Sequence, residues 1–327
     1  MRALIASTHD YPRRPDWVAQ VDFVLKPGSS WLSQVRRLAH DVASKYRLLI
    51  LDGSIGIAGR SPDLAAAAII ARRRRPPAMI LTECNWKPGS GTAKMLRHIG
   101  IRAVDRAVAR YCVYTKAELQ TFPARWSVDP GKMAFTPFYY HLTDEELAQA
   151  PIAGTHVFSG GDSLRDYETL VEVARGLPME FRIASARASF PDAPPNVNIG
   201  RVPHSDYIQL VRSAAVVVVP LTAGVVRTAG LETFLTGMAM GKIIITTDSP
   251  GIRDYVDDGR TGLIVPPGDV AAMRAAISWA VDPANAEQVA QIAAAGRESA
   301  RRDFSPDAYV AKLLEISDEV LAHTTSR

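Results

Sequence analysis

Residues 214–269 carry the pattern that most constrains how this chain can fold. An apolar, β-branched run (214–219) ends at Pro220, a loop rich in Gly, Thr and Ala follows, and a helical pattern runs from about Leu231 to Met240. Gly241 stands where a helix would end, and a second apolar run (243–246) leads into a turn at 248–251. The order strand, small-residue loop, helix, strand is typical of a parallel α/β sheet. Backbone N–H groups in such a loop and the positive end of the helix dipole attract anions, so we predict an anion site at the carboxyl end of the sheet.

The same alternation of apolar runs and helical patterns extends along most of the chain. Strands are predicted at 4–7, 23–25, 48–51, 79–81, 111–114, 133–135, 155–158, 181–184, 197–199, 215–219 and 243–246. Helices are predicted at 29–46, 63–73, 93–109, 166–176, 205–213 and, with a break at 303–306, over the Ala-rich tail 271–321. Because the alternation pauses at 143–154 and then restarts, we predict two Rossmann-like α/β domains, residues 1–150 and 151–327.

Two motifs carry a resemblance to a known family. Residues 237–245 (GMAMGKIII) and 262–269 (GLIVPPGD) resemble the nucleotide-sugar half of the retaining family-4 glycosyltransferases, and the resemblance covers 155–270 well and 79–140 loosely. It implies the GT-B fold, in which two Rossmann-like domains face across a cleft and the last helix crosses back to the first domain. It also implies a nucleoside diphosphate sugar donor on domain 151–327, an acceptor (glycan, lipid or small molecule) on domain 1–150, retention, and no metal or other cofactor. No Asp-x-Asp cluster that would hold a metal is present in the sequence.

The chain departs from the family at its two signature glutamates. Their positions fall on Thr228 and Thr236. In the family these acids position the donor sugar and bind the ribose hydroxyls, and a threonine oxygen accepts such bonds without charge. Glu232 lies one helical turn before Thr236 and could supply the lost carboxylate. A solvent-facing helix glutamate is the alternative.

Two arginines are candidates to bind the donor diphosphate. The family's phosphate-binding lysine corresponds to Arg165, which follows the turn at Gly160 and Gly161, whereas the family's arginine corresponds to Gly161 itself. Arginine binds phosphate oxygens bidentately. Arg227 directly precedes the loop of Thr228, Ala229 and Gly230 and could replace the missing cation. The alternative for each arginine is a surface side chain.

Two further residues are candidates for catalysis in the first domain. Glu83 follows the strand predicted at 79–81, where many family members carry a histidine, and His9 follows the first strand. A carboxylate or imidazole there could orient an acceptor or take a proton. Packing or surface roles remain the alternative, and Cys84 lacks a neighbouring histidine that would activate it.

Composition and charge limit the remaining classes. The chain of 327 residues begins without the pattern of a signal peptide, has no apolar run long enough to span a bilayer, and holds two cysteines, which predicts a cytoplasmic protein with reduced thiols. Residues 1–150 carry 22 Lys and Arg against 13 Asp and Glu and the remainder 16 against 21, so the total of +4 divides into +9 and −5. The basic half includes Arg72 to Arg75 and a string predicted along one helix side: Lys94, Arg97, Arg102, Arg106 and Arg110. This half could face anionic lipid at the inner face of the membrane, an anionic acceptor or nucleic acid, or be a solvated basic surface.

Three functions follow from these observations. The first is an active glycosyltransferase. The second is a non-catalytic GT-B protein that binds a nucleotide, a glycan or a protein partner, since both signature glutamates are replaced. The third is a basic binder of nucleic acid or membrane, whose binding would depend strongly on salt. The ordered loop and helix favour the first over the third.

Overall fold

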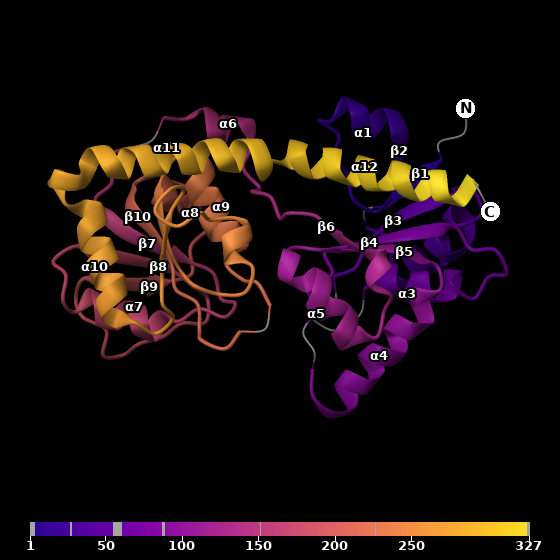
Figure 1. Ribbon diagram of the computed structural model, residues 1–327, viewed down its shortest axis with the longest axis horizontal. Coiled ribbons are helices and arrows are strands. Elements are labelled where there is room, and N and C mark those ends of the chain that lie inside the picture. The colour runs from indigo at the N-terminus through magenta and orange to yellow at the C-terminus, as the bar shows by residue number, and fades with distance from the viewer. Residues whose placement is uncertain are drawn as a thin grey trace. The chain divides into compact units, whose positions relative to one another are not determined.

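The computed structural model describes residues 4–26, 28–54, 61–86, 89–150, 152–225 and 227–325. The chain divides into two compact units, of which the first comprises residues 1–137 with 309–327 and the second residues 138–308. Each unit is built on a six-stranded, wholly parallel sheet (Figure 1). The predicted α/β class is thus confirmed.

The first sheet has the strand order β2-β1-β3-β4-β5-β6. Its strands are β1 (Ile5–Ser7), β2 (Val21–Phe23), β3 (Leu48–Asp52), β4 (Ala78–Thr82), β5 (Val108–Val113) and β6 (Met133–Phe135). The central strand β3 is paired with β4 along its whole length and is buried on both faces from Leu48 to Leu51. Such continuous apolar runs are what a parallel sheet covered on both sides requires.

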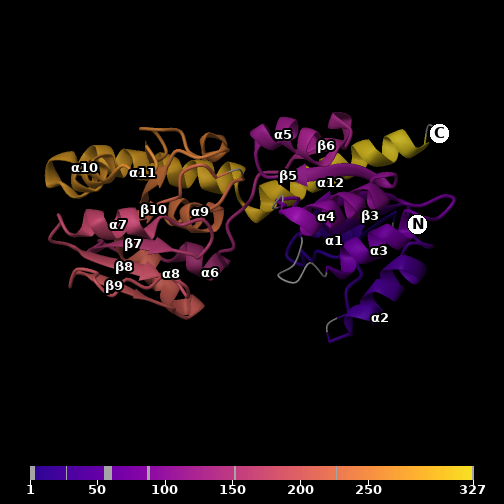
Figure 2. The ribbon, with the colours of Figure 1, turned by 90° about the horizontal axis from the view of Figure 1, so that it is seen from below.

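Helices cover both faces of the first sheet. They are α1 (Pro15–Gln20), α2 (Trp31–Arg36), α3 (Pro62–Ile70), α4 (Gly91–Asp105), α5 (Lys116–Trp126) and α12 (Pro306–Thr325), with a π-helical turn η1 (Arg37–Val42) and a 3-10 turn η2 (Pro130–Lys132). Helices α2, α3 and α4 follow one another along one face (Figure 2), and their buried residues join those of α5 in one core. The chain returns to this unit through α12, where Glu319 lies 3.7 Å from Arg110 of β5.

The second sheet has the strand order β12-β11-β10-β7-β8-β9. Its strands are β7 (His156–Gly160), β8 (Glu180–Ala184), β9 (Val197–Gly200), β10 (Ala214–Val219), β11 (Ile243–Thr247) and β12 (Leu263–Val265). Strands β7, β8 and β9 follow one another toward one edge of the sheet, whereas β10, β11 and β12 follow one another toward the other edge. The neighbouring pair β7 and β10 is therefore the topological switch point, where ligands bind in open α/β sheets.

Helices also cover both faces of the second sheet. They are α6 (Asp144–Ala148), α7 (Tyr167–Ala174), α8 (His204–Arg212), α9 (Leu231–Ala239), α10 (Val270–Val281) and α11 (Ala286–Asp303), with 3-10 turns η3 (Ile252–Asp254) and η4 (Pro283–Asn285). Helices α7 and α10 pack together on one face, where Val216, Val218 and Ile245 of the sheet contribute to the core. Helices α8, α9 and α11 are the neighbours on the other face.

Several predicted boundaries differ from the structure. The helix predicted at 29–46 is α2 followed by the π-helical turn, in which the Ala43 N–H donates to Leu38 O, five residues earlier, at 3.1 Å. The helix predicted at 93–109 ends at Asp105, because β5 begins at Val108. Helix α5, the short helices α1 and α6, and strand β12 were not predicted.

The segment that joins the two sheets belongs structurally to the second unit. The Phe138 N–H donates to the Tyr255 hydroxyl at 2.9 Å, and the Tyr140 N–H donates to Phe304 O at 3.1 Å. Residues 138–150 are therefore tied to the second sheet's helices and loops. In the part of the chain that the structure describes, no helix combines the length and apolarity needed to cross a bilayer.

Candidate functional site

Two loops meet at the switch point of the second sheet. The loop after β7 turns through Gly161 and Leu164, both at positive φ (98° and 57°), and Arg165 then forms an antiparallel bridge with Leu221, just after β10. The Asp166 N–H donates to Pro220 O at 3.0 Å, and the Thr222 N–H donates to Leu164 O at 3.1 Å. These backbone bonds fix the two loops against each other.

Arg165 is held in this loop by its whole guanidinium group. Nε donates to Gly160 O at 2.9 Å, Nη1 to Ser163 O at 2.8 Å and Nη2 to Thr233 Oγ1 at 3.2 Å. Burial lowers the pKa of Arg165 from its ordinary value, yet an arginine keeps its charge at neutral pH. A hydrogen bond with the Tyr167 side chain adds to these contacts and opposes the lowering of the Arg165 pKa.

The N-terminus of α9 lies directly beside Arg165. Helix α9 begins after Gly230, which has φ 82°. A Cβ at this glycine would lie 2.6 Å from Val219 Cγ1 and 3.7 Å from Arg165 Nη1. Only glycine therefore lets the backbone approach β10 and the arginine so closely. The first backbone N–H groups of α9 and the Arg165 cation therefore lie side by side at the place where the sequence predicts an anion site.

The hydroxyl of Thr233 links the two loops beneath this site. Thr233 Oγ1 donates to Gly160 O at 3.1 Å and also bonds the Tyr207 hydroxyl at 3.0 Å. A Cβ at Gly160 would lie 2.5 Å from the Tyr207 ring, so this glycine is needed for the ring to pack there. Sequence reasoning missed Thr233 and Tyr207, since neither residue stands in a motif.

A cavity of about 490 Å³ opens over these groups, wholly within the second unit. Five of the residues singled out from the sequence line it: Gly161, Arg165, Gly230, Glu232 and Thr236. It is also lined by His141, Leu142, Asp162, Ser163, Val202, His204, Tyr207, Ile208 and Thr233. Its volume is that of a pocket for a small organic ligand.

The remaining predicted residues of this region support the loops. Arg227 Nη2 donates to Ser163 Oγ at 2.9 Å, and its Nη1 lies 3.4 Å from Thr228 O, so Arg227 holds the same loop as Arg165. Thr228 and Ala229, which precede α9 in the chain, are buried and are not among the described residues that line the cavity.

Glu232 is paired with a histidine from the segment that joins the sheets. His141 Nδ1 lies 2.6 Å from Glu232 Oε2, and both side chains are about half exposed. The His141 ring packs against Phe138 and Tyr139, with ring centroids 5.4 and 4.6 Å apart. The Glu232 carboxylate is thus held at the cavity wall by a residue 91 positions away.

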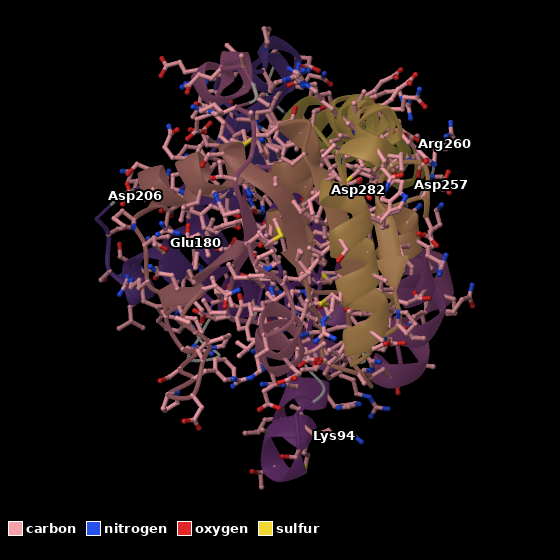
Figure 3. The ribbon with its side chains drawn as sticks, turned by 90° about the vertical axis from the view of Figure 1, so that its left-hand side faces the viewer. Lys94, Glu180, Asp206, Asp257, Arg260 and Asp282 are labelled. Carbon is pink, nitrogen blue, oxygen red and sulfur yellow. The ribbon has the colours of Figure 1, made fainter. Side chains whose placement is uncertain are left out.

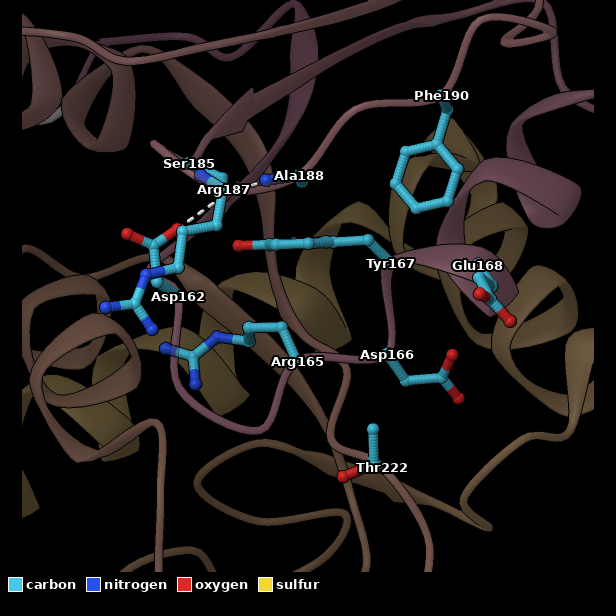
Figure 4. A pocket seen from close by; sticks show the side chains of 10 residues that line it. All are labelled: Asp162, Arg165, Asp166, Tyr167, Glu168, Ser185, Arg187, Ala188, Phe190 and Thr222. Atoms are coloured by element: carbon cyan, nitrogen blue, oxygen red, sulfur yellow. Dashed lines mark hydrogen bonds between the residues drawn. The ribbon is translucent and has the colours of Figure 1, made fainter.

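A second hollow, of about 330 Å³, shares Arg165 and Asp162 with the first. Figure 4 shows the guanidinium groups of Arg165 and Arg187 at the same end of this hollow as the Asp162 carboxylate. Asp162 Oδ1 accepts from Ser185 Oγ at 2.5 Å and from the Ala186 N–H at 3.0 Å. The Ser185 hydroxyl is the main cause that lowers the pKa of Asp162.

The carboxyl edge of the first sheet carries a different set of groups. His9 Nε2 lies 2.7 Å from Thr82 Oγ1, which joins the ends of β1 and β4 across β3. Burial lowers the pKa of His9, and the charge of Asp52 opposes this effect. Asp63, at the start of α3, accepts from the Thr8 hydroxyl and, at 2.8 Å, from the Asp52 N–H. Burial raises the pKa of Asp63 to about 6.

Glu83 stands at the same edge, immediately after β4, with φ 55°. Positive φ is uncommon for a residue with a side chain and here redirects the chain at the strand end. Cys84, the next residue, is fully buried, and burial raises its pKa well above the ordinary value. His9 and Glu83 thus lie at one edge, whereas Cys84 is a core residue.

Among the residues that the structure describes, no cluster of three or more His, Cys, Asp or Glu side chains could hold a metal ion.

Residues 180–282 match the family model described as glycosyl transferases group 1. No match was found among the curated proteins. The fold is similar to that of a glycosyltransferase from Rickettsia africae, with TM-score 0.66, 15% identity and coverage of 97% of this chain and 90% of that one.

Two further solved structures share the fold. Sucrose-phosphate synthase from Thermosynechococcus elongatus has TM-score 0.64 and 17% identity, with coverage of 92% of this chain and 81% of that one. Anabaena HepE, solved in complex with UDP-glucose, has TM-score 0.63 and 14% identity, with coverage of 97% and 91%. The chain therefore has the GT-B fold predicted from its sequence, and the match of residues 180–282 supports a glycosyltransferase.

Proposed function

We propose that this protein is a GT-B glycosyltransferase of the family-4 type that takes a sugar from a nucleoside diphosphate sugar. The observation that carries the proposal is the cavity at the switch point of the second sheet, where Arg165 and the N-terminus of α9 converge. A nucleoside diphosphate has the charge that this arrangement attracts. HepE binds UDP and UDP-glucose, so uridine nucleotides are the first donors to test.

In this proposal the second unit stabilises the departing diphosphate. As the bond between the sugar and the diphosphate breaks, negative charge grows on the phosphate oxygens. Arg165 and the backbone N–H groups at the start of α9 would stabilise that charge, and Arg227, through Ser163, would hold the loop in place. Because protein groups would neutralise the charge of the departing diphosphate, transfer is proposed to need neither metal nor cofactor.

Glu232 and Thr236 would bind the sugar or ribose hydroxyls of the donor. Both line the cavity on one side of α9, one helical turn apart. Glu232 would provide the charged acceptor that Thr236 lacks, and its contact with His141 at 2.6 Å would hold the carboxylate in place.

The first unit would bind the acceptor at the carboxyl edge of its sheet. Glu83 and His9 would orient the attacking hydroxyl and take its proton, while the new bond forms on the face of the sugar that the diphosphate leaves, so that configuration is retained. The acceptor, whether glycan, lipid or small molecule, is left open. We also propose that the protein is cytoplasmic and that its basic first unit contacts anionic membrane.

One observation favours a second function, a non-catalytic GT-B protein that binds a nucleotide, glycan or partner. Thr228 and Thr236 stand where the family carries its two acids, and Thr228 is buried away from the cavity lining. Such a protein would bind the nucleotide without consuming the sugar donor.

A thermal-shift panel tests both functions. UDP, GDP, ADP, TDP and their sugar conjugates are added to the protein in the presence of a chelator. We expect one diphosphate family to raise the melting temperature, because a ligand of the folded state stabilises it by mass action. Release of the diphosphate from the matching sugar nucleotide then separates the enzyme from the binder. If none of these nucleotides shifts the melting temperature, the donor site is refuted.

A further inference from the structure

Helix α4 of the first unit exposes an apolar surface beside its basic residues. Met95, Leu96 and Ile99 are 58%, 64% and 56% exposed. Met95 and Ile99 lie one turn apart on the same side of the helix, and Leu96 lies beside them. The opposite side is anchored in the core by Ile101 and Val104. This apolar surface is contiguous, in contrast to the single exposed apolar residues that are normal on protein surfaces.

Positive charges surround the apolar surface. Lys94 and Arg102 are exposed, and Arg102 follows Ile99 by three residues on the same side of α4. Figure 3 shows Lys94 extending outward from the helix. The only acidic residue of α4 is Asp105, which lies at its end and binds Lys132 at 3.0 Å. The exposed side therefore combines apolar and cationic groups without an exposed carboxylate.

The structure corrects the predicted basic string in one respect. Arg106 donates to Arg73 O, and Arg110 lies in β5, 3.7 Å from Glu319. These two arginines contact other residues of the first unit, whereas Lys94, in the exposed first turns of α4, and Arg102, beside Ile99, are exposed. Exposed Arg72, Arg74 and Arg75 follow the end of α3. Because Arg106 binds Arg73 O, they lie at the C-terminal end of α4 and are not part of the surface near its start.

We propose that the exposed side of α4, formed by Met95, Leu96, Ile99, Lys94 and Arg102, docks on an anionic lipid bilayer. A helix that lies in the membrane interface inserts apolar side chains among the acyl chains while its cations bind lipid phosphates. Charge complementarity selects anionic lipid over a neutral surface, and the lack of acidic side chains on this face removes the repulsion that such lipid would cause.

This docking deepens the proposed membrane contact and has a consequence for the acceptor. Helix α4 follows β4 in the chain, and its N-terminal half holds the apolar residues. The carboxyl end of β4 carries Glu83, the proposed acceptor-side residue. A bilayer bound at the start of α4 would therefore lie on the side of the first unit where an acceptor is expected, which favours an acceptor carried by a lipid.

Flotation of the full chain with lipid vesicles tests the docking surface. One set of vesicles contains phosphatidylcholine alone and the other contains about one third phosphatidylglycerol, a surface to which each exposed Lys or Arg adds attraction. We expect the protein to float with the anionic vesicles at low salt, and flotation to weaken at high salt. Replacing Met95, Leu96 and Ile99 together by Ser should lower binding roughly tenfold or more. Lys94→Glu with Arg102→Glu should lower it to a similar extent.

Matched controls come from the second unit. Ile152→Ser removes an apolar residue that is 50% exposed, and Arg260→Glu reverses an exposed charge, so both variants should float like the unmodified protein. Leu96→Ser alone, at the most exposed position, serves if the triple variant fails to fold. The proposal is overturned if the protein does not float, floats equally with neutral vesicles, or floats unchanged in the α4 variants. Because nucleotide binding is measured separately by thermal shift, failure of docking is distinguishable from failure of the donor site.

Discussion

The carboxyl edges of the two sheets hold opposite chemistry on the same architecture. At the edge of the second sheet, the central group is a cation: Arg165 is fixed by three hydrogen bonds beside the N-terminus of α9. At the edge of the first sheet, the groups are acids and an imidazole: Asp52, Asp63, Glu83 and His9. Parallel strands bring loop residues together at one edge in both units, and the loop sequences decide which groups stand there, a cation in the second unit and titratable acids with an imidazole in the first.

The sharpest test of this comparison is to remove the two groups proposed to exchange a proton. His9→Ala and Glu83→Gln should each slow sugar transfer by about 10²-fold or more, the range of general acid–base catalysis. The affinity for the nucleoside diphosphate should stay unchanged, because both residues belong to the first unit. The rate of diphosphate release and the dissociation constant of the nucleotide are the two measurements. A loss of nucleotide affinity in either variant would contradict the proposal that the second unit alone binds the nucleotide.

The buried acid of the first edge gives a pH-dependent stability with no counterpart in the second. Burial raises the pKa of Asp63 to about 6 from an ordinary 3.8, so the folded protein favours the protonated carboxyl. This contribution is complete below about pH 4, and the free energy of unfolding then falls by up to roughly 3 kcal/mol as pH rises to about 6.

Urea denaturation of the protein and of Asp63→Asn across this range measures the effect. The difference between the two unfolding free energies should change between pH 4 and pH 6 and level off above the folded pKa of about 6. At the second edge, Asp162 is exposed and its pKa is lowered, so Asp162→Asn should lack this slope. A constant difference between protein and Asp63→Asn would show that Asp63 is not buried as a neutral acid.

The anion site of the second edge is tested by removing its cation. Arg165→Ala should weaken binding of the diphosphate by about 2 kcal/mol, roughly 30-fold, because a hydrogen bond to a charged group is lost. Arg165→Lys should recover part of the affinity, since the charge remains but the fork is lost. Arg182→Ala, which removes an arginine of β8 paired with Glu180 at 2.7 Å, is the control, and titration calorimetry the measurement. Unchanged affinity in a folded Arg165→Ala protein would exclude Arg165 from the site.

Sequence reasoning predicted the second unit better than the first for a physical reason. Strand β11 and the part of β10 from Val216 to Val219 are fully buried runs of β-branched residues, so their composition alone identifies them. Gly230 was predicted within the loop because a small residue is needed there, and its φ of 82° supplies the cause. In the first unit, the π-helical turn after α2 and the short helix α1 lack a distinctive hydrophobic period. The turn was therefore predicted as a continuation of α2, and α1 was not predicted.

Contacts between distant segments could not be predicted from local patterns. His141 and Glu232 are 91 positions apart, and the hydroxyl of Thr233 meets Gly160 from 73 positions away. The prediction that five basic residues line one helix was wrong for the same reason. The helical spacing was extended past Asp105, where α4 ends, so that Arg110, which lies in β5, was included. Spacing predicts neighbours within an element, whereas these contacts depend on how the elements pack.

The smallest expected effect tests whether Glu232 takes the role proposed for the family's missing acid. If His141 holds the Glu232 carboxylate for a donor hydroxyl, Glu232→Gln and His141→Ala should each weaken binding of the sugar nucleotide by about 1 kcal/mol, the usual net value of one hydrogen bond. The two changes should not add, because each removes the same interaction. Glu172→Gln is a matched control, since Glu172 is an exposed helix glutamate with its own ion-pair partner, Arg175, at 3.2 Å. Calorimetric titration of the two single variants and the double variant gives the coupling energy. Additive losses would mean that His141 and Glu232 contribute independently to binding of the sugar nucleotide. If the double variant binds as tightly as the unmodified protein, Glu232 does not bind the ribose hydroxyls, and Thr236 remains as their only proposed partner.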